Sequence, residues 1–237
     1  MVATSVRIIA PTGWDVGMKR TIAVFVGLLA LVGPAVAESP VAIVEEVQGK
    51  VTGAEYMDYL APKTVIKLSA NSSVVISYLK SCRREKIDGL GTVIVGTDES
   101  LVHLATMKDE KTDCDTSHAH ATTRETGEVA ATVVRSAGKK DLPKSELTLY
   151  GASPLVQATG RGTLLIERLD VPGERQQVDL DGKQFKGKFY DFAGTSKSLT
   201  PGGTYSAKFG SSRIVFLVDA RAKPGPTPIV GRLVRMD

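Results

Sequence analysis

Short runs of apolar residues, separated by turn signals every 8–12 residues, dominate the chain beyond residue 40. The clearest run, residues 74–79, is rich in β-branched and aromatic side chains. No stretch shows a sustained period of 3.6 residues bounded by helix caps. The pattern predicts an all-β protein built as a sandwich or barrel. The expected strands cover residues 41–44, 47–51, 64–68, 74–79, 92–95, 101–104, 129–134, 163–169, 176–180, 214–218 and 229–234.

Polar stretches between these runs predict loops and one linker. Residues 54–60 could form one helical turn, and residues 107–127 are almost wholly polar and predict a long surface loop. Asp181-Gly182 is a hairpin signal. Residues 139–145 are polar and contain Pro143, which is typical of a linker. We therefore expect two small β domains, residues 38–138 and 146–237.

The second predicted domain has about seven short strands in some ninety residues, which favours an Ig-like β-sandwich. It lacks the disulfide and the core tryptophan of that fold, so the prediction rests on the number of strands.

The N-terminus has the order of a secretory signal peptide. Lys19 and Arg20 precede an apolar run at residues 22–32, and the small residues 35–37 form a cleavage site. The run is too short to span a bilayer, which takes about 20 residues, and no cysteine follows it to carry a lipid. We expect cleavage after Ala37 and a periplasmic or secreted protein with no transmembrane segment, translated from Met1 or from Met18.

Composition narrows the choice of partners. The net charge of +4 falls to about +2 without residues 1–37. A nucleic-acid binder carries a much more basic surface, so nucleic acid is not an expected partner. The only tryptophan, Trp14, lies in the expected leader, which weighs against stacking of bases or sugars. Lys183, Lys186 and Lys188 form a basic stripe, either a solubilising face or a weak contact with an anionic envelope surface.

The only two cysteines, Cys82 and Cys114, are expected to form a disulfide in an exported protein. The alternative is a copper or zinc site in which Cys114 joins His118 and His120, with Asp113 and Asp115 nearby. Both interpretations remain open from the residues alone.

Catalytic arrangements are poorly represented. The imidazoles available to a triad are His103, His118 and His120, and no Gly-x-Ser-x-Gly elbow occurs. A Cys114–His118 nucleophile pair competes with the disulfide. Paired acids such as Glu45-Glu46 alternate along a strand, face opposite sides and are expected at solvated edges. We expect a protein without catalytic activity or cofactor.

Residues 47–51, 61–68 and 73–79 together resemble the periplasmic domain of FecR-like proteins, which begins with a Gly-x-Val strand. The resemblance covers residues 43–104; in place of the family's Asp-Gly-Ser tripeptide the chain has residues 80–85. The Leu-x-Pro-Gly-Gly-Thr-Tyr stretch at residues 199–205 is similar to a turn in Ig-like modules that follow such domains.

The resemblance implies a signalling or envelope-scaffolding role and carries no catalytic residue. The sequence therefore predicts a non-enzymatic periplasmic protein that acts as an accessory, sensory or scaffolding module on an unidentified envelope or signalling protein. The alternative is a periplasmic copper- or zinc-binding protein.

Overall fold

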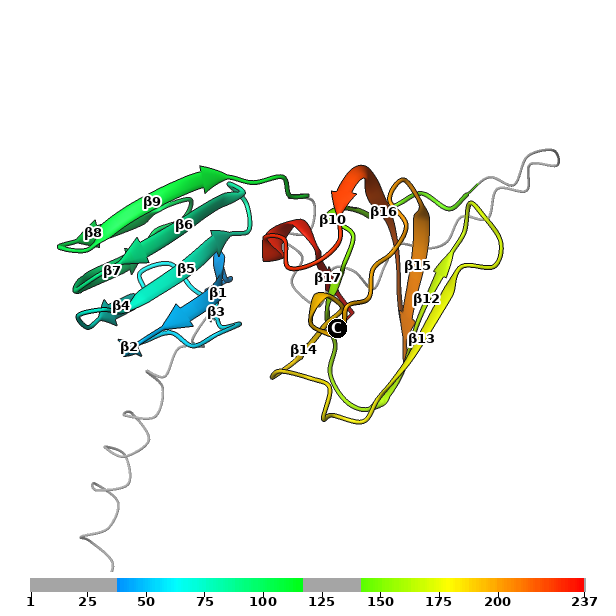
Figure 1. The fold of residues 1–237 in the computed structure, drawn as a ribbon, viewed down its shortest axis with the longest axis horizontal. Helices are drawn as coiled ribbons and strands as arrows, with labels where there is room; N and C mark the ends of the chain where they lie inside the picture. Colours follow the sequence, from blue (N-terminus) through cyan, green and yellow to red (C-terminus); the bar gives the residue numbers. More distant parts are fainter. Residues whose placement is uncertain (1–37, 117–141, 237) are drawn as a thin grey trace, which may run out of the picture. The chain divides into compact units, whose positions relative to one another are not determined.

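The structure is a computed structural model that describes residues 38–116 and 142–236 (Figure 1). Strands account for nearly all of its regular structure, and the helical turns in these two ranges are η3 (Ala193–Thr195) and η4 (Ile229–Gly231). The all-β prediction is confirmed. The expected leader, residues 1–37, and the expected strand at residues 129–134 lie outside the described residues.

The first half of the described chain contains two sheets, and every strand pair in them is antiparallel. The sheet of order β3-β1-β5-β6-β9 consists of β3 (Tyr59–Leu60), β1 (Ala42–Gln48), β5 (Ser73–Tyr78), β6 (Arg83–Asp88) and β9 (Thr106–Lys111). The sheet of order β2-β4-β7-β8 consists of β2 (Val51–Thr52), β4 (Val65–Leu68), β7 (Gly91–Val95) and β8 (Ser100–His103).

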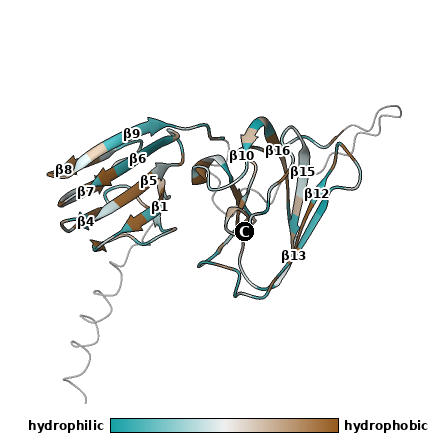
Figure 2. Cartoon of the chain, in the orientation of Figure 1, coloured by the Kyte–Doolittle hydropathy of each residue, from teal (hydrophilic) through white to brown (hydrophobic). Residues whose placement is uncertain are grey.

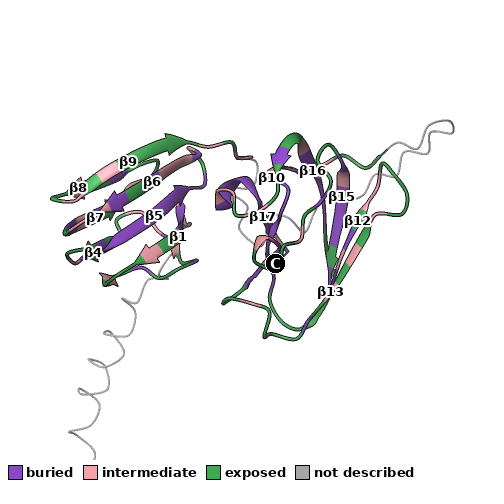
Figure 3. Ribbon diagram, viewed as in Figure 1, coloured by how far each residue is buried: buried purple, intermediate pink, exposed green. Residues whose placement is uncertain are grey.

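Inward-facing aliphatic side chains of both sheets form one apolar core. β5 is buried along its whole length, whereas β4 alternates between exposed and buried residues (Figure 3). Alternation of this kind places every second residue of a strand in the core. The buried members of the core are Ala42, Val44, Ala54, Leu60, Ile66, Leu68, Val74, Ile76, Tyr78, Ile87, Val93 and Val95.

A bulge in β1 corrects one expectation. The register with β5 shifts between Val44 and Glu46, so that Glu45 is inserted into the strand. Its side chain is only 6% exposed and accepts hydrogen bonds from Arg84 Nε at 2.7 Å and Ser77 Oγ at 2.8 Å. The expectation of a solvated edge is therefore wrong for Glu45, because the bulge turns its carboxylate towards these donors.

The second half contains a five-stranded and a three-stranded sheet, with two parallel pairs, β10 with β16 and β11 with β17. The larger, of order β10-β16-β15-β12-β13, consists of β10 (Leu147–Gly151), β16 (Ser212–Lys223), β15 (Thr204–Phe209), β12 (Gly162–Arg168) and β13 (Arg175–Leu180). The smaller, of order β14-β11-β17, consists of β14 (Phe189–Asp191), β11 (Leu155–Gln157) and β17 (Leu233–Arg235).

Aromatic residues supply much of the core in this half. Tyr205 stacks on Phe216 with ring centroids 5.8 Å apart, and Tyr190 meets Phe192 edge-on at 5.2 Å. Such pairs stabilise a core beyond the area they bury. Leu164 and Ile166 of β12 complete the centre of the cluster.

Several expected elements differ from the structure. Part of the predicted loop forms β9, and residues 54–60 contain a turn followed by β3 rather than a helical turn. The expected strand at residues 229–234 begins as η4. Asp181-Gly182 joins no strand pair, because β12 pairs with β13 across the preceding turn, where Gly173 has a φ of 100°.

The described residues belong to one compact unit. Of the predicted linker, residues 142–145 are described and contain no strand. The division into two domains at residues 139–145 stays a prediction.

Candidate functional site

The outer face of the sheet β2-β4-β7-β8 carries a row of apolar side chains. Ile66 and Leu68 of β4 are buried in the core, while Val65 is exposed on the opposite face. Val65 lies opposite Ile94 of β7, and Ile94 lies opposite Leu101 of β8. We call these three residues the Val65 row; their exposed fractions are 46%, 39% and 69%. Figure 2 shows the apolar colouring along β4, β7 and β8.

A single exposed apolar residue is ordinary on a protein surface. Three directly neighbouring ones on adjacent strands are different, because cross-strand neighbours lie close enough to act as one patch. A contiguous apolar row on one sheet face is a candidate interaction surface. Covering the exposed parts of the Val65 row would contribute roughly 3 kcal/mol, taking about 1 kcal/mol for each half-exposed aliphatic side chain.

Cationic and polar side chains lie beside the apolar row. Lys67 of β4 lies opposite Thr92 of β7, and Thr92 lies opposite His103 of β8. Lys67 and His103 are exposed. Among the residues that these four described strands turn outward, none is acidic. The face therefore suits a partner that presents apolar side chains together with carboxylates.

Charged side chains of β6 lie beside the edge strand β8. Glu85 of β6 is fully buried, and its Oε1 accepts hydrogen bonds from Ser100 N at 3.1 Å and Arg83 Nε at 2.9 Å. Arg83 also pairs with Glu99 and Asp109, both at 3.3 Å. Because Glu85 accepts from the Ser100 amide, that one amide of β8 is not available to a further strand.

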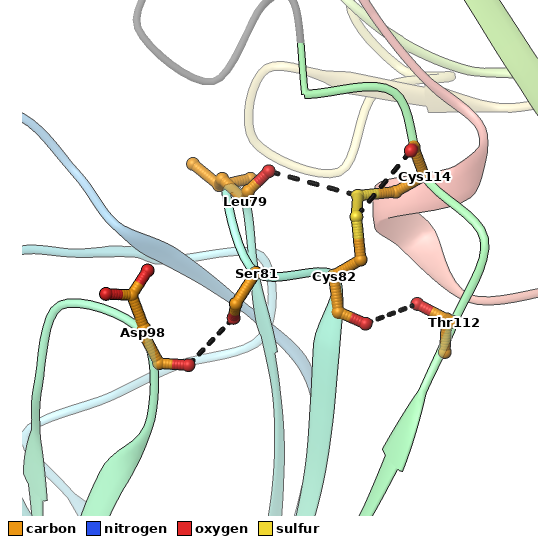
Figure 4. Close-up of a disulfide and its surroundings, with 6 residues drawn as sticks. All are labelled: Leu79, Ser81, Cys82, Asp98, Thr112 and Cys114. Atoms are coloured by element: carbon orange, nitrogen blue, oxygen red, sulfur yellow. Dashed lines mark hydrogen bonds between the residues drawn. A yellow bond between two sulfur atoms is a disulfide. The ribbon is translucent and has the colours of Figure 1, made fainter.

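The predicted disulfide between Cys82 and Cys114 is present (Figure 4). Cys82 is buried and lies in the left-handed region with a φ of 55°. Thr112 N donates to Cys82 O at 2.8 Å, and Ser81 Oγ donates to Asp98 O at 2.7 Å. Closing a loop with a sequence separation of 32 residues stabilises the fold by about 3.5 kcal/mol in the chain-entropy model.

The bond takes Cys114 out of the candidate metal site, since a disulfide sulfur offers no thiolate. It likewise leaves no thiol for a Cys114–His118 pair. His118 and His120 lie outside the described residues, and so does any site they form. Within residues 38–116 and 142–236, no three metal-ligating side chains come together.

The basic stripe is exposed at all three lysines, Lys183, Lys186 and Lys188. Lys186 Nζ lies 5.1 Å from the centre of the Tyr56 ring, a cation–π contact. The stripe is therefore one stacked lysine flanked by two surface lysines.

Tyr205, the last residue of the Leu-x-Pro-Gly-Gly-Thr-Tyr stretch, forms a corner at the start of β15. Its hydroxyl accepts a hydrogen bond from Thr200 N at 2.9 Å and donates one to Glu174 Oε1 at 2.7 Å. Burial, together with the Glu174 carboxylate, raises the pKa of Tyr205 to about 12. Arg168 pairs with Glu174 and Asp170 beside it. The arrangement is structural, since these hydrogen bonds hold the turn at residues 199–203 against β15.

The sequence interpretation missed the Val65 row as a surface feature. Val65, Ile94 and Leu101 lie in runs that are apolar at successive positions, so the expected strands at residues 64–68, 92–95 and 101–104 did not separate inner from outer side chains. Which parity faces the core depends on the partner sheet. The signal was Lys67 in the otherwise apolar run 65–68. A lysine is expected to face solvent, and Val65, two residues before it, lies on the same face of the strand.

No family model matches the chain, and no curated protein or solved structure matches it either. In the described part of the chain, no helix is long and apolar enough to cross a membrane.

Proposed function

We propose that this protein is an exported, non-enzymatic accessory module that binds another envelope protein through the Val65 row. The observation that carries the proposal is the contiguous apolar row on an otherwise cationic and neutral sheet face. The partner is a protein surface with apolar side chains bordered by carboxylates.

The disulfide supports the exported location, because disulfides form and persist in oxidising compartments such as the periplasm. The leader predicted at residues 1–37 supports the same location. The periplasm, and cleavage after Ala37, are part of the proposal.

Two features support modules of the FecR-like and Ig-like kind. Residues 42–111 form two sheets around one core, in keeping with a sandwich-like β array. In the second half, the Tyr205 hydroxyl is bonded to the backbone five residues upstream, as in the tyrosine corner of Ig sandwiches. The FecR-like and Ig-like assignments belong to the proposal.

The test compares immobilised full-length protein with two single variants, Ile94→Lys and Leu101→Lys, in envelope extract of the native host. Val171→Lys is the matched control, because Val171 is 48% exposed in the turn between β12 and β13. Thermal melts establish that all variants fold equally.

We expect wild type and the control to retain the same envelope protein, and its Kd to weaken about fivefold in either row variant. That factor corresponds to the loss of about 1 kcal/mol when one side chain of the Val65 row no longer contributes. Equal retention by the row variants and the control, or no retained protein at all, would contradict the proposal.

A further inference from the structure

Apolar side chains from both halves of the described chain pack into one cluster, which we call the seam. The seam excludes water from contacts far apart in the sequence, so it holds the halves together by burial. Its buried members are Ile43, Met57 and Leu79 from the first half and Leu155, Phe189, Ile229 and Val230 from the second.

Polar contacts cross the seam beside the apolar cluster. The Ile229 amide donates to Oε1 of Glu45, the bulge residue of β1. The Tyr59 hydroxyl donates to Gln157 Oε1. The Ile229 amide therefore reports directly on whether the seam is closed.

The segment 112–115 joins the disulfide to the seam. Cys114 packs against the apolar cluster. Asp115 Oδ2 accepts a hydrogen bond from the Thr148 amide of β10 at 2.7 Å. The Asp113 carbonyl lies so close to Gly231 that a Cβ there would approach its oxygen to 2.7 Å. The segment thus contacts β10 and η4 of the second half while its own cysteine is bonded to the first.

We propose that the Cys82–Cys114 disulfide is a redox-sensitive cross-link that keeps the seam packed. In the oxidised protein it holds the segment 112–115 against β10 and η4. When an external dithiol reduces it, the segment is released and the seam loosens, while the sheets of each half stay folded.

The chemistry of the step is thiol–disulfide exchange. A thiolate of the dithiol attacks the Sγ of Cys114, the less buried of the two cysteines, and the Cys82 sulfur leaves and takes a proton. The second thiol of the reagent then displaces Cys114 as a thiol. Two electrons pass to the protein, and the dithiol becomes a cyclic disulfide.

The experiment measures amide hydrogen exchange by NMR on the full chain, oxidised and after reduction with dithiothreitol. On reduction, the Thr148 and Ile229 amides are expected to exchange at least tenfold faster. Amides in the centres of β5 and β16 are expected to keep their rates. Asp115→Ala retains the disulfide and should accelerate exchange at Thr148 but not at Ile229.

A double variant, Cys82→Ser with Cys114→Ser, should show the reduced pattern with or without dithiol. If that variant fails to fold, reduction of the prefolded protein still decides the matter. Unchanged exchange at Thr148 and Ile229 after reduction would show that the seam stays packed without the disulfide. Faster exchange throughout β5 and β6 would show that the bond maintains the first half rather than the seam. Either result overturns the proposal.

Discussion

Arg232 is a buried cation in the second half, and its removal is the sharpest test of how that half is held together. The residue is 3% exposed and forms two hydrogen bonds to Asp191, at 2.6 and 3.2 Å. It also donates to the Thr227 carbonyl at 2.9 Å and the Ser153 carbonyl at 3.2 Å. One guanidinium thus joins β14 to the loops that precede β11 and η4.

Arg232→Ala would leave a carboxylate and two carbonyls without this donor. Breaking a buried pair by removing one partner costs about 3–5 kcal/mol. Because the Asp191 side chain is 26% exposed and so partly hydrated, we expect the lower end, about 3 kcal/mol. For a chain of this size the melting temperature should fall by roughly 6–12 °C. Arg232→Lys keeps the charge but loses the planar fork of N–H donors, so we expect about half of the destabilisation caused by Arg232→Ala.

The assay is urea unfolding followed by circular dichroism, with Asp191→Ala and the double variant completing a cycle. The single variants should each destabilise the protein, and the double should cost about 1–2 kcal/mol less than their sum, because the two side chains act as one unit. The reasoning would be refuted if the two single-variant losses in unfolding free energy simply added up in the double variant. A loss of less than about 0.5 kcal/mol for Arg232→Ala would refute it as well.

Three further predictions concern stability. Cys82→Ser with Cys114→Ser should lower the free energy of unfolding by about 3.5 kcal/mol, measured by urea unfolding of the oxidised wild type and the variant. Tyr205→Phe should cost about 1–2 kcal/mol, read as a lower urea midpoint, because Thr200 N and Glu174 lose a partner. The Arg168 guanidinium lowers the pKa of Asp170 from 3.8 to about 2, so the folded protein binds this proton less readily than the unfolded chain. Its contribution to stability is present above pH 3.8 and lost as the pH falls towards 2; urea midpoints across this range should therefore fall less for Asp170→Asn than for wild type.

Strands whose inner side chains are aliphatic were predictable, and those made of charged residues were not. β5 and β7 satisfy the pattern because β-branched side chains fill the core. β6 was missed because its buried positions are Glu85 and Ile87 among charged neighbours. β9 was assigned to a loop because its residues are mostly exposed (Figure 3). Both strands exist because the backbone of β5 and then of β6 supplies hydrogen bonds whatever the side chains are.

The disulfide followed from two cysteines and an expected leader, without any geometry. For the Val65 row, Lys67 was a sequence signal that Val65 faces outward, whereas the facing of Ile94 and Leu101 depends on register, because a shift of one residue exchanges the two faces of a strand. Likewise, the hydrogen bond from the Ser100 amide to Glu85 depends on the distance between two strands that come close only in the folded protein.

The most direct test of the account is site-specific photo-cross-linking in the native host. A photoreactive phenylalanine analogue replaces Leu101 in one variant and Val171 in a control of similar exposure. The account predicts a discrete adduct of higher mass from position 101, lost when Ile94→Lys is added, and none from position 171. No adduct at position 101, or the same adducts from both positions, would contradict it.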